Sequence, residues 1–255
     1  MPDRRDMTDP TNLAALLGSY PRPRPPLTPA HEAIFARQYR INREGAGGVE
    51  GLAQRLERWM HAQVAQLRGG PILELGAGTL NHLHHEPPGE AYDVVEPFRE
   101  LFSERPEATR VRSFFDDVAD IPPDRSYRRI ISIAVLEHLT DLPRDVARAS
   151  LHLQPRGVFQ AGIPSEGGLL WWIGWRFSTG ISYRLRTGLD YGVVMRHEHV
   201  NRAPEILAIV RHLFGNVAIR RFPFPGHHTS FYTYVEARIP DYDRCRQVLG
   251  LRTGS

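Results

Sequence analysis

Histidine and carboxylate side chains gather in two short segments, and both could take a proton from a reacting hydroxyl or amine. The first segment is Glu137-His138, and the second is residues 196–199, with the sequence RHEH. Histidine is the commonest general base because its ordinary pKa lies close to neutral pH. We predict Glu137, His138, His197 and His199 as candidate catalytic residues. The alternative is that Glu137 and His138 only begin a helix.

A glycine turn ends the apolar run ILELGAGT, residues 72–79. Glycine allows the backbone to approach a ligand closely and to adopt a positive φ. We therefore predict that Glu74, Gly76, Ala77 and Gly78 bind a ligand. The alternative is a tight strand-to-helix turn that holds no ligand.

Acidic residues follow the next two predicted strands. Glu96 comes directly after the run AYDVV, and a carboxylate at the tip of a second strand can accept hydrogen bonds from two ribose hydroxyls. The alternative for Glu96 is a solvated strand end. Asp116, Asp117 and Val118 follow the third strand, where a carboxylate and a backbone amide could contact an adenine ring.

These motifs together resemble the class I S-adenosylmethionine-dependent methyltransferases. The resemblance covers about residues 70–163 and rests on ELGAGT, the acid after the second strand, DVADIP, YRRIISIAVLEHL and LQPRGVF, in the family's order. It implies a Rossmann-like fold with S-adenosylmethionine as cofactor. The chain departs from the family at Leu80, where many relatives have a further glycine. Rossmann oxidoreductases are the nearest rival, but they prefer glycine where this chain has Asn81.

The resemblance also assigns the cofactor contacts. It implies that Gly76 and Gly78 border the methionine part and that Glu96 holds the ribose. Asp117 with Val118 would face the adenine, with Asp116 as the alternative contact. Ala134 would lie at the end of the fourth strand, beside the sulfonium.

A divalent metal is an alternative role for the histidine segments. Some relatives, including small-RNA 2′-O-methyltransferases and quinone-pathway O-methyltransferases, bind a metal with an E-H pair and further acids or histidines. By this resemblance Glu137, His138 and one of His197 or His199 would be ligands. The additional glutamate of those relatives is Ala134 here, so we predict no metal and favour a general base.

The segment of about 165–201 is a long insertion after the fifth strand and supplies the predicted acceptor site. Its run LLWWIGW could form an apolar lid, and the arginines after it suit a phosphate or carboxylate because guanidinium offers paired donors. Alternatively, the tryptophans are core and the arginines are solvated, or the segment rests on a membrane surface. The candidate acceptor-binding residues are Tyr39, Arg43, Trp175, Arg176, Arg184, Arg186, Tyr191 and Arg196.

The elements that must position these residues alternate along the chain. Short apolar runs such as PILEL, RIISIAV and GVFQAGI are separated by helical or turn-like stretches, which predicts parallel strands with crossover helices. The runs NVAIRRFPF and TSFYTYVEAR predict a terminal antiparallel pair. We therefore expect a three-layer Rossmann-like α/β sheet that is mostly parallel, with an antiparallel terminal strand.

The domain organisation follows from the remaining segments. Residues 1–30 are rich in proline and arginine and predict a flexible or surface-bound tail. Residues 31–69 predict an N-terminal helical cap over the site, or a homodimer surface. Residues 70–255 predict the methyltransferase domain.

Composition limits the class of protein. The formal net charge is only +3, so nucleic acid is a disfavoured partner. One cysteine excludes an internal disulfide, and the chain has neither an eighteen-residue apolar run nor a secretion signal. We expect a cytoplasmic protein without a membrane span.

Three functions remain open. The favoured one is methyl transfer from S-adenosylmethionine to oxygen or nitrogen of a small, anionic acceptor in natural-product or glycan biosynthesis. One alternative is a metal-assisted RNA 2′-O-methyltransferase. The other is a non-catalytic S-adenosylmethionine-binding partner protein.

Overall fold

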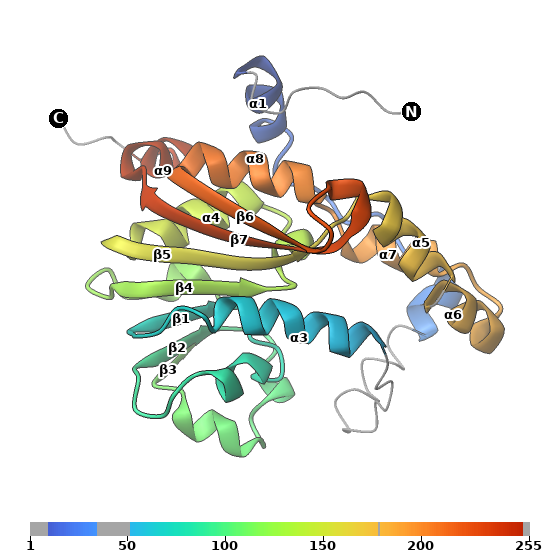
Figure 1. Cartoon of the computed structure of the whole chain (residues 1–255), viewed down its shortest axis with the longest axis horizontal. Coiled ribbons are helices and arrows are strands. Elements are labelled where there is room, and N and C mark those ends of the chain that lie inside the picture. Colours follow the sequence, from blue (N-terminus) through green and yellow to red (C-terminus); the bar gives the residue numbers. More distant parts are fainter. Residues whose placement is uncertain (1–9, 35–51, 178, 252–255) are drawn as a thin grey trace.

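The structure is a computed structural model that describes residues 10–34, 52–177 and 179–251. Within these ranges the chain forms one seven-stranded sheet in the order β3-β2-β1-β4-β5-β7-β6 (Figure 1). The strands are β1 (Ile72–Leu75), β2 (Tyr92–Val95), β3 (Ser113–Phe115), β4 (Tyr127–Ile133), β5 (Leu153–Pro164), β6 (Phe214–Pro223) and β7 (Ser230–Pro240).

The strand directions confirm the predicted fold class. Strands β1 to β5 pair in parallel, whereas β7 runs antiparallel to both β5 and β6. Every residue of β1 and β2 is buried, which is the expected state of central parallel strands covered on both faces. Because the parallel strands share a direction, their carboxyl ends lie on the same side of the sheet. The residues that follow β1, β2, β3, β4 and β5 therefore meet there.

Helices cover the two faces of the sheet and complete three layers (Figure 1). On one face α3 (Leu52–Val64) contacts β4, β5 and β7. The other face packs α4 (Leu142–Leu151) and α8 (Ala203–Leu213), which α9 (Tyr242–Leu249) joins. Alternate residues of β1 point to opposite faces of the sheet. Leu73 belongs to the core cluster with α4 and α8, whereas Ile72 packs with Val64 of α3.

Three of the crossovers differ from the predicted helices. The links between β1 and β2, β2 and β3, and β3 and β4 contain short 3₁₀ helices: η1 (Asn81–His85), η2 (Arg99–Leu101), η3 (Pro106–Arg110) and η4 (Val118–Asp120). The first link begins with a glycine turn and ends in Pro87-Pro88-Gly89, which leaves room for little more than one helical turn.

A buried polar cluster lies between η1 and the α3 face of the sheet. His82 is fully buried and contacts Glu86 at 2.9 Å. Both oxygens of Glu86 also accept hydrogen bonds from the buried Arg129 at 2.9 Å. Burial alone would raise the pKa of Glu86, but its hydrogen bonds from His82 and Arg129 lower it to about 2.

Residues 10–28 of the N-terminal segment pack against the rest of the domain, which is the surface-bound alternative of the predicted tail. Helix α1 (Pro10–Leu17) contacts α8 and places Leu16 in the main apolar core. Further along, Arg22 forms an ion pair with Glu205 at 3.0 Å. The apolar stripe of NLAALL supplies this packing, which the proline-rich composition of the segment hides.

The predicted cap falls partly outside the described residues. Residues 29–34 are helical, and the buried His31 lies 2.9 Å from the carbonyl oxygen of Asp190. Helix α3 lies on a face of the sheet rather than over the strand tips. In the described part of the chain, no helix combines the length and apolarity needed to cross a membrane.

Candidate active site

The glycine turn after β1 has the backbone that the sequence predicts. Gly76 has φ +67°, and a Cβ there would collide with the side chain of Val135 at the tip of β4. Gly78 has φ +50°, and a Cβ there would meet no atom within 4 Å. The first glycine is therefore required by close packing, whereas the second faces open space beside the turn.

Leu80 has the left-handed backbone conformation that glycine usually adopts. Its φ is +61°, and its side chain is fully buried in the cluster that includes Leu83. A left-handed conformation costs a non-glycine residue about 1–2 kcal/mol. Complete burial of a leucine contributes about 1.5–3 kcal/mol, which offsets that cost. The departure from the family pattern therefore leaves the turn intact.

Glu96 points at the glycine turn from the tip of β2. Its Oε2 accepts a hydrogen bond from the Gly78 amide at 2.8 Å, and its Oε1 accepts one from the Phe98 amide at 3.1 Å. A carboxylate has about four acceptor positions, so two remain after these bonds. The arrangement fits a ribose whose two hydroxyls bind beside the open space at Gly78.

The two aspartates after β3 differ in how they are engaged. Asp116 is exposed and pairs with Arg99 at 2.9 Å. Asp117 caps η4, because its Oδ1 accepts a hydrogen bond from the Ala119 amide at 2.7 Å. Val118 packs its side chain into the core. An adenine contact from any of the three stays a prediction.

The other predicted cofactor residues lie at or just before the strand tips. Glu74 is buried within the sheet and accepts a hydrogen bond from the Tyr92 hydroxyl at 2.7 Å. Burial raises the pKa of Glu74 despite that hydrogen bond. Ala77 is buried in the turn. Ala134 has φ +55° at the end of β4, and its amide continues the ladder to Gly162.

Three of the predicted catalytic residues come together after β4. Glu137 and His138 lie on the 3₁₀ helix η5 (Leu136–His138), and His199 follows α7 (Tyr191–Glu198). One ligand atom from each of these three side chains lies within 4.8 Å of the others. Val135, which packs against Gly76, immediately precedes η5, so this group adjoins the glycine turn.

The two histidines of this group have different hydrogen-bond partners. His138 Nδ1 lies 2.9 Å from the carbonyl oxygen of Glu198, so it donates and leaves the lone pair of the neutral ring on Nε2. Burial and the neighbouring His199 lower the pKa of His138 to about 4. Burial also opposes the charge on His199, but the hydrogen bond that His199 donates to Glu166 and the charge of Glu137 outweigh it and raise the pKa of His199.

Glu166 is a site residue that the sequence did not predict. It follows β5, and its Oε2 lies 2.7 Å from His199 Nδ1 and accepts a hydrogen bond from Trp171 Nε1 at 3.0 Å. By binding Nδ1, the carboxylate therefore fixes the orientation of the His199 ring. Its position directly after a parallel strand was the available signal, since such residues meet at the ligand-binding edge.

Two further residues missed by the sequence fix the shape of this group. The side-chain amide of the buried Asn201 donates to the carbonyl oxygens of Leu136 and Leu139, at 2.8 Å and 2.7 Å. Arg24 donates to the carbonyl oxygen of His138 at 2.8 Å. The N-terminal segment and the end of the insertion thus hold η5 in place.

His197 is not part of the group. Its Nδ1 lies 2.7 Å from the carbonyl oxygen of Pro25, so it binds the N-terminal segment. The alternative between His197 and His199 therefore resolves to His199 among the described residues. Glu137, His138 and His199 could offer a metal ion three ligand atoms, one from each side chain.

The insertion contains α5 (Leu169–Phe177), α6 (Thr179–Thr187) and α7. Trp175 contacts Tyr191, with ring centroids 6.1 Å apart. Trp175, Arg176, Arg184 and Asp190 line a pocket of about 200 Å³. This pocket lies at the start of α7 and His199 at its end, so a helix of eight residues, about 12 Å long, separates them.

The remaining acceptor-binding predictions have separate outcomes. Arg186 and Arg196 are exposed, and Arg186 donates to the carbonyl oxygen of Ser182 in its own helix. The predicted contacts from Tyr39 and Arg43 lie outside the described residues.

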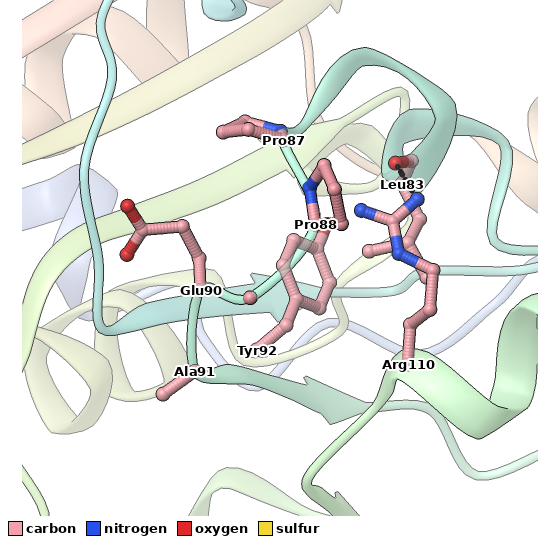
Figure 2. Close-up of a pocket in the computed structure, with 8 residues that line it drawn as sticks. Leu83, Pro87, Pro88, Glu90, Ala91, Tyr92 and Arg110 are labelled. Carbon is pink, nitrogen blue, oxygen red and sulfur yellow. Dashed lines mark hydrogen bonds between the residues drawn. The ribbon is translucent and has the colours of Figure 1, made fainter.

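Another pocket, of about 350 Å³, lies at the amino ends of the strands, opposite the glycine turn (Figure 2). Glu90 and Arg110 line it near the amino end of β2. Glu90 accepts a hydrogen bond from the Gly70 amide, and Arg110 donates to the carbonyl oxygens of Leu83 and Glu86. Both charged groups therefore support local backbone, and this pocket is separate from the glycine turn.

Comparison with solved structures identifies the fold. An O-methyltransferase family protein from Burkholderia thailandensis is 15% identical with a TM-score of 0.51, covering 91% of this chain and 68% of that one. The N-methyltransferase NodS from Bradyrhizobium japonicum WM9, solved with S-adenosyl-L-homocysteine, is 15% identical with a TM-score of 0.51, covering 73% and 88%.

A possible histamine N-methyltransferase from Thermotoga maritima is 14% identical with a TM-score of 0.51, covering 82% of this chain and 96% of that one. By sequence, no family model and no curated protein matches the chain. The chain thus has the fold of class I S-adenosylmethionine-dependent methyltransferases, which confirms the predicted resemblance at the level of the fold.

Proposed function

We propose that this protein binds S-adenosylmethionine and transfers its methyl group to an oxygen or nitrogen atom of a small acceptor. The observation that carries the proposal is the Glu96 carboxylate, which is fixed beside Gly78 with two acceptor positions left. The fold supports it, because ligands of such sheets bind at the carboxyl ends of the strands.

The cofactor would be held by the tips of β1 and β2. Gly76 and Gly78 let the backbone approach the ligand, and Glu96 accepts hydrogen bonds from its sugar. When bound, S-adenosylmethionine supplies a methyl group that is already activated for transfer. The protein then has to align an acceptor with that methyl group and remove a proton from it.

His199 is the proposed general base. Glu166 engages Nδ1, so the Nε2 side of the ring is the side that can accept a proton from a hydroxyl or amine. Glu137 adds negative charge that favours the protonated ring once the proton has moved. His138 and Asn201 act as positioning residues, because they join η5 to the end of α7 through Glu198 and Leu136.

The proposed acceptor is a small molecule that carries a phosphate or carboxylate, as in natural-product or glycan biosynthesis. Arg176 and Arg184 line a pocket with Trp175 and offer paired donors to such a group. We propose that this anionic group binds about 12 Å, the length of α7, from the atom that receives the methyl group. We also retain the proposal that the protein works in the cytoplasm.

The direct test is transfer of labelled methyl from S-adenosylmethionine into a panel of anionic hydroxyl and amine compounds. Transfer that requires His199, measured with His199→Ala, supports the proposal. Binding of the cofactor without transfer to any acceptor would favour the non-catalytic alternative. Transfer to RNA with a steep dependence on salt would favour the nucleic-acid alternative.

A further inference from the structure

Helices α5 and α6 leave an unusual amount of apolar surface uncovered. No residue of α5 is buried, and in the described part of α6 only Tyr183 is. The exposed fraction reaches 46% for Trp172, 62% for Phe177 and 83% for Leu185. An apolar helix that packs this little against its own domain indicates a surface that another apolar phase covers.

Helices α5 and α6 form a helical hairpin, and the exposed apolar side chains of the protein are concentrated in it. Of ten large exposed apolar residues in the described chain, six belong to α5 and α6. The β6–β7 turn adds the exposed Phe224, and η6 (His227–Thr229) in that turn contacts α5. The hairpin projects beyond the sheet at the end opposite α9 (Figure 1). The six residues are Leu169, Trp172, Ile173, Phe177, Ile181 and Leu185.

The charge of the hairpin is of one sign. Residues 169–189 contain Arg176, Arg184 and Arg186 and no acidic residue. All three arginines are exposed, and the guanidinium of Arg176 lies 5.7 Å from the ring centroid of Trp172. Apolar and aromatic side chains beside arginines match the composition of helices that lie in the headgroup layer of an anionic bilayer.

A second copy of the chain is a poorer occupant of the same surface. In a two-fold symmetric dimer the same patch of both copies meets, and residues 169–189 contain no acidic residue that could pair with the arginines of the other copy. An anionic bilayer instead covers the apolar side chains and neutralises the arginines. The charge pattern therefore selects a lipid surface.

We propose that the α5–α6 hairpin docks this protein on an anionic membrane surface. Trp172 and Leu185 enter the boundary between headgroups and acyl chains, and Arg186 contacts lipid phosphate. The docking goes beyond the proposed methyl transfer and does not depend on it, because Trp172, Leu185 and Arg186 do not line the proposed acceptor pocket.

Sedimentation of the full chain with vesicles tests the docking. The probes are phosphatidylcholine vesicles and vesicles that mix phosphatidylcholine with phosphatidylglycerol. We expect binding to the mixed vesicles only. The variant Trp172→Ala/Leu185→Ser should lose about tenfold or more of that binding, and Arg186→Glu should remove the preference for anionic lipid.

Matched variants separate docking from a general loss of structure. Leu251→Ser and Arg156→Glu change exposed residues elsewhere and should bind vesicles as the unchanged chain does. Thermal unfolding midpoints should stay equal, since all the altered side chains are exposed. No binding to either vesicle, equal binding by the hairpin variants, or a dimer that Leu185→Ser dissociates would overturn the proposal.

Discussion

Glu166 Oε2 and His199 Nδ1 lie 2.7 Å apart and join the end of β5 to the end of α7. The two residues are 33 positions apart in the chain, and the whole insertion lies between them. The position of His199, the proposed general base, therefore depends on how the insertion folds. The same carboxylate oxygen also accepts from Trp171, so α5 is tied to the proposed catalytic histidine.

The first prediction concerns this pair. Glu166→Gln keeps the size of the side chain but removes the charge that orients and favours protonated His199. We expect turnover to fall about tenfold to a hundredfold, within the range typical of general-base contributions, with unchanged affinity for S-adenosylmethionine. Glu104→Gln, at an exposed acid between η2 and η3, is the matched control. Equal turnover in Glu166→Gln and the unchanged protein would contradict the role of Glu166.

The second prediction concerns metal. Because the further glutamate of the metal-binding relatives is Ala134 here, which leaves three possible ligand atoms in the group of Glu137, His138 and His199, we expect no thermal stabilisation by Mg²⁺, Mn²⁺ or Zn²⁺. Differential scanning fluorimetry with each ion measures this. A rise in unfolding temperature that Glu137→Gln abolishes would instead establish a metal site.

The third prediction concerns Asn201. Asn201→Ala leaves the buried carbonyl oxygens of Leu136 and Leu139 without their donor. We expect a loss of about 1–3 kcal/mol in the free energy of unfolding, measured in urea. The exposed Asn216→Ala is the matched control. A change no larger than the control's would mean that Asn201 does not hold η5.

The fourth prediction concerns pH. Burial, followed by the charges of His82 and His85, lowers the pKa of His61 to about 3. The unfolded chain therefore binds this proton below about pH 6.5, whereas the folded chain does not until about pH 3. Stability should fall by roughly 1–2 kcal/mol between pH 7 and pH 5. His61→Gln should show a weaker fall, and an identical pH profile would argue against a half-buried, neutral His61.

Much of the fold could be predicted because its sequence signals are local. The apolar runs at β1, β4 and β5 mark buried parallel strands, and the glycines at 76 and 78 mark the turn between β1 and η1. Leu80 shows the limit of such patterns. Its left-handed backbone is set by burial of its side chain, which the family's glycine pattern does not anticipate.

The rest of the site depends on contacts between distant segments. The sequence offered His197 and His199 equally, and they are separated by contacts with distant segments, since His197 binds the carbonyl oxygen of Pro25 and His199 binds Glu166. Glu166 was missed because its partner lies across the insertion. The ordered segment around Arg22 was missed because its partner is Glu205, on α8.

The account rests on a cofactor sugar held by Glu96, and isothermal titration calorimetry with S-adenosylmethionine tests that most directly. The unchanged chain and Glu104→Ala, which alters an exposed acid nearby, should bind alike. Glu96→Ala should lose about 3 kcal/mol, roughly a hundredfold in affinity, because two hydrogen bonds to a charged group disappear. No binding by the unchanged chain, or full affinity in Glu96→Ala, would contradict the account.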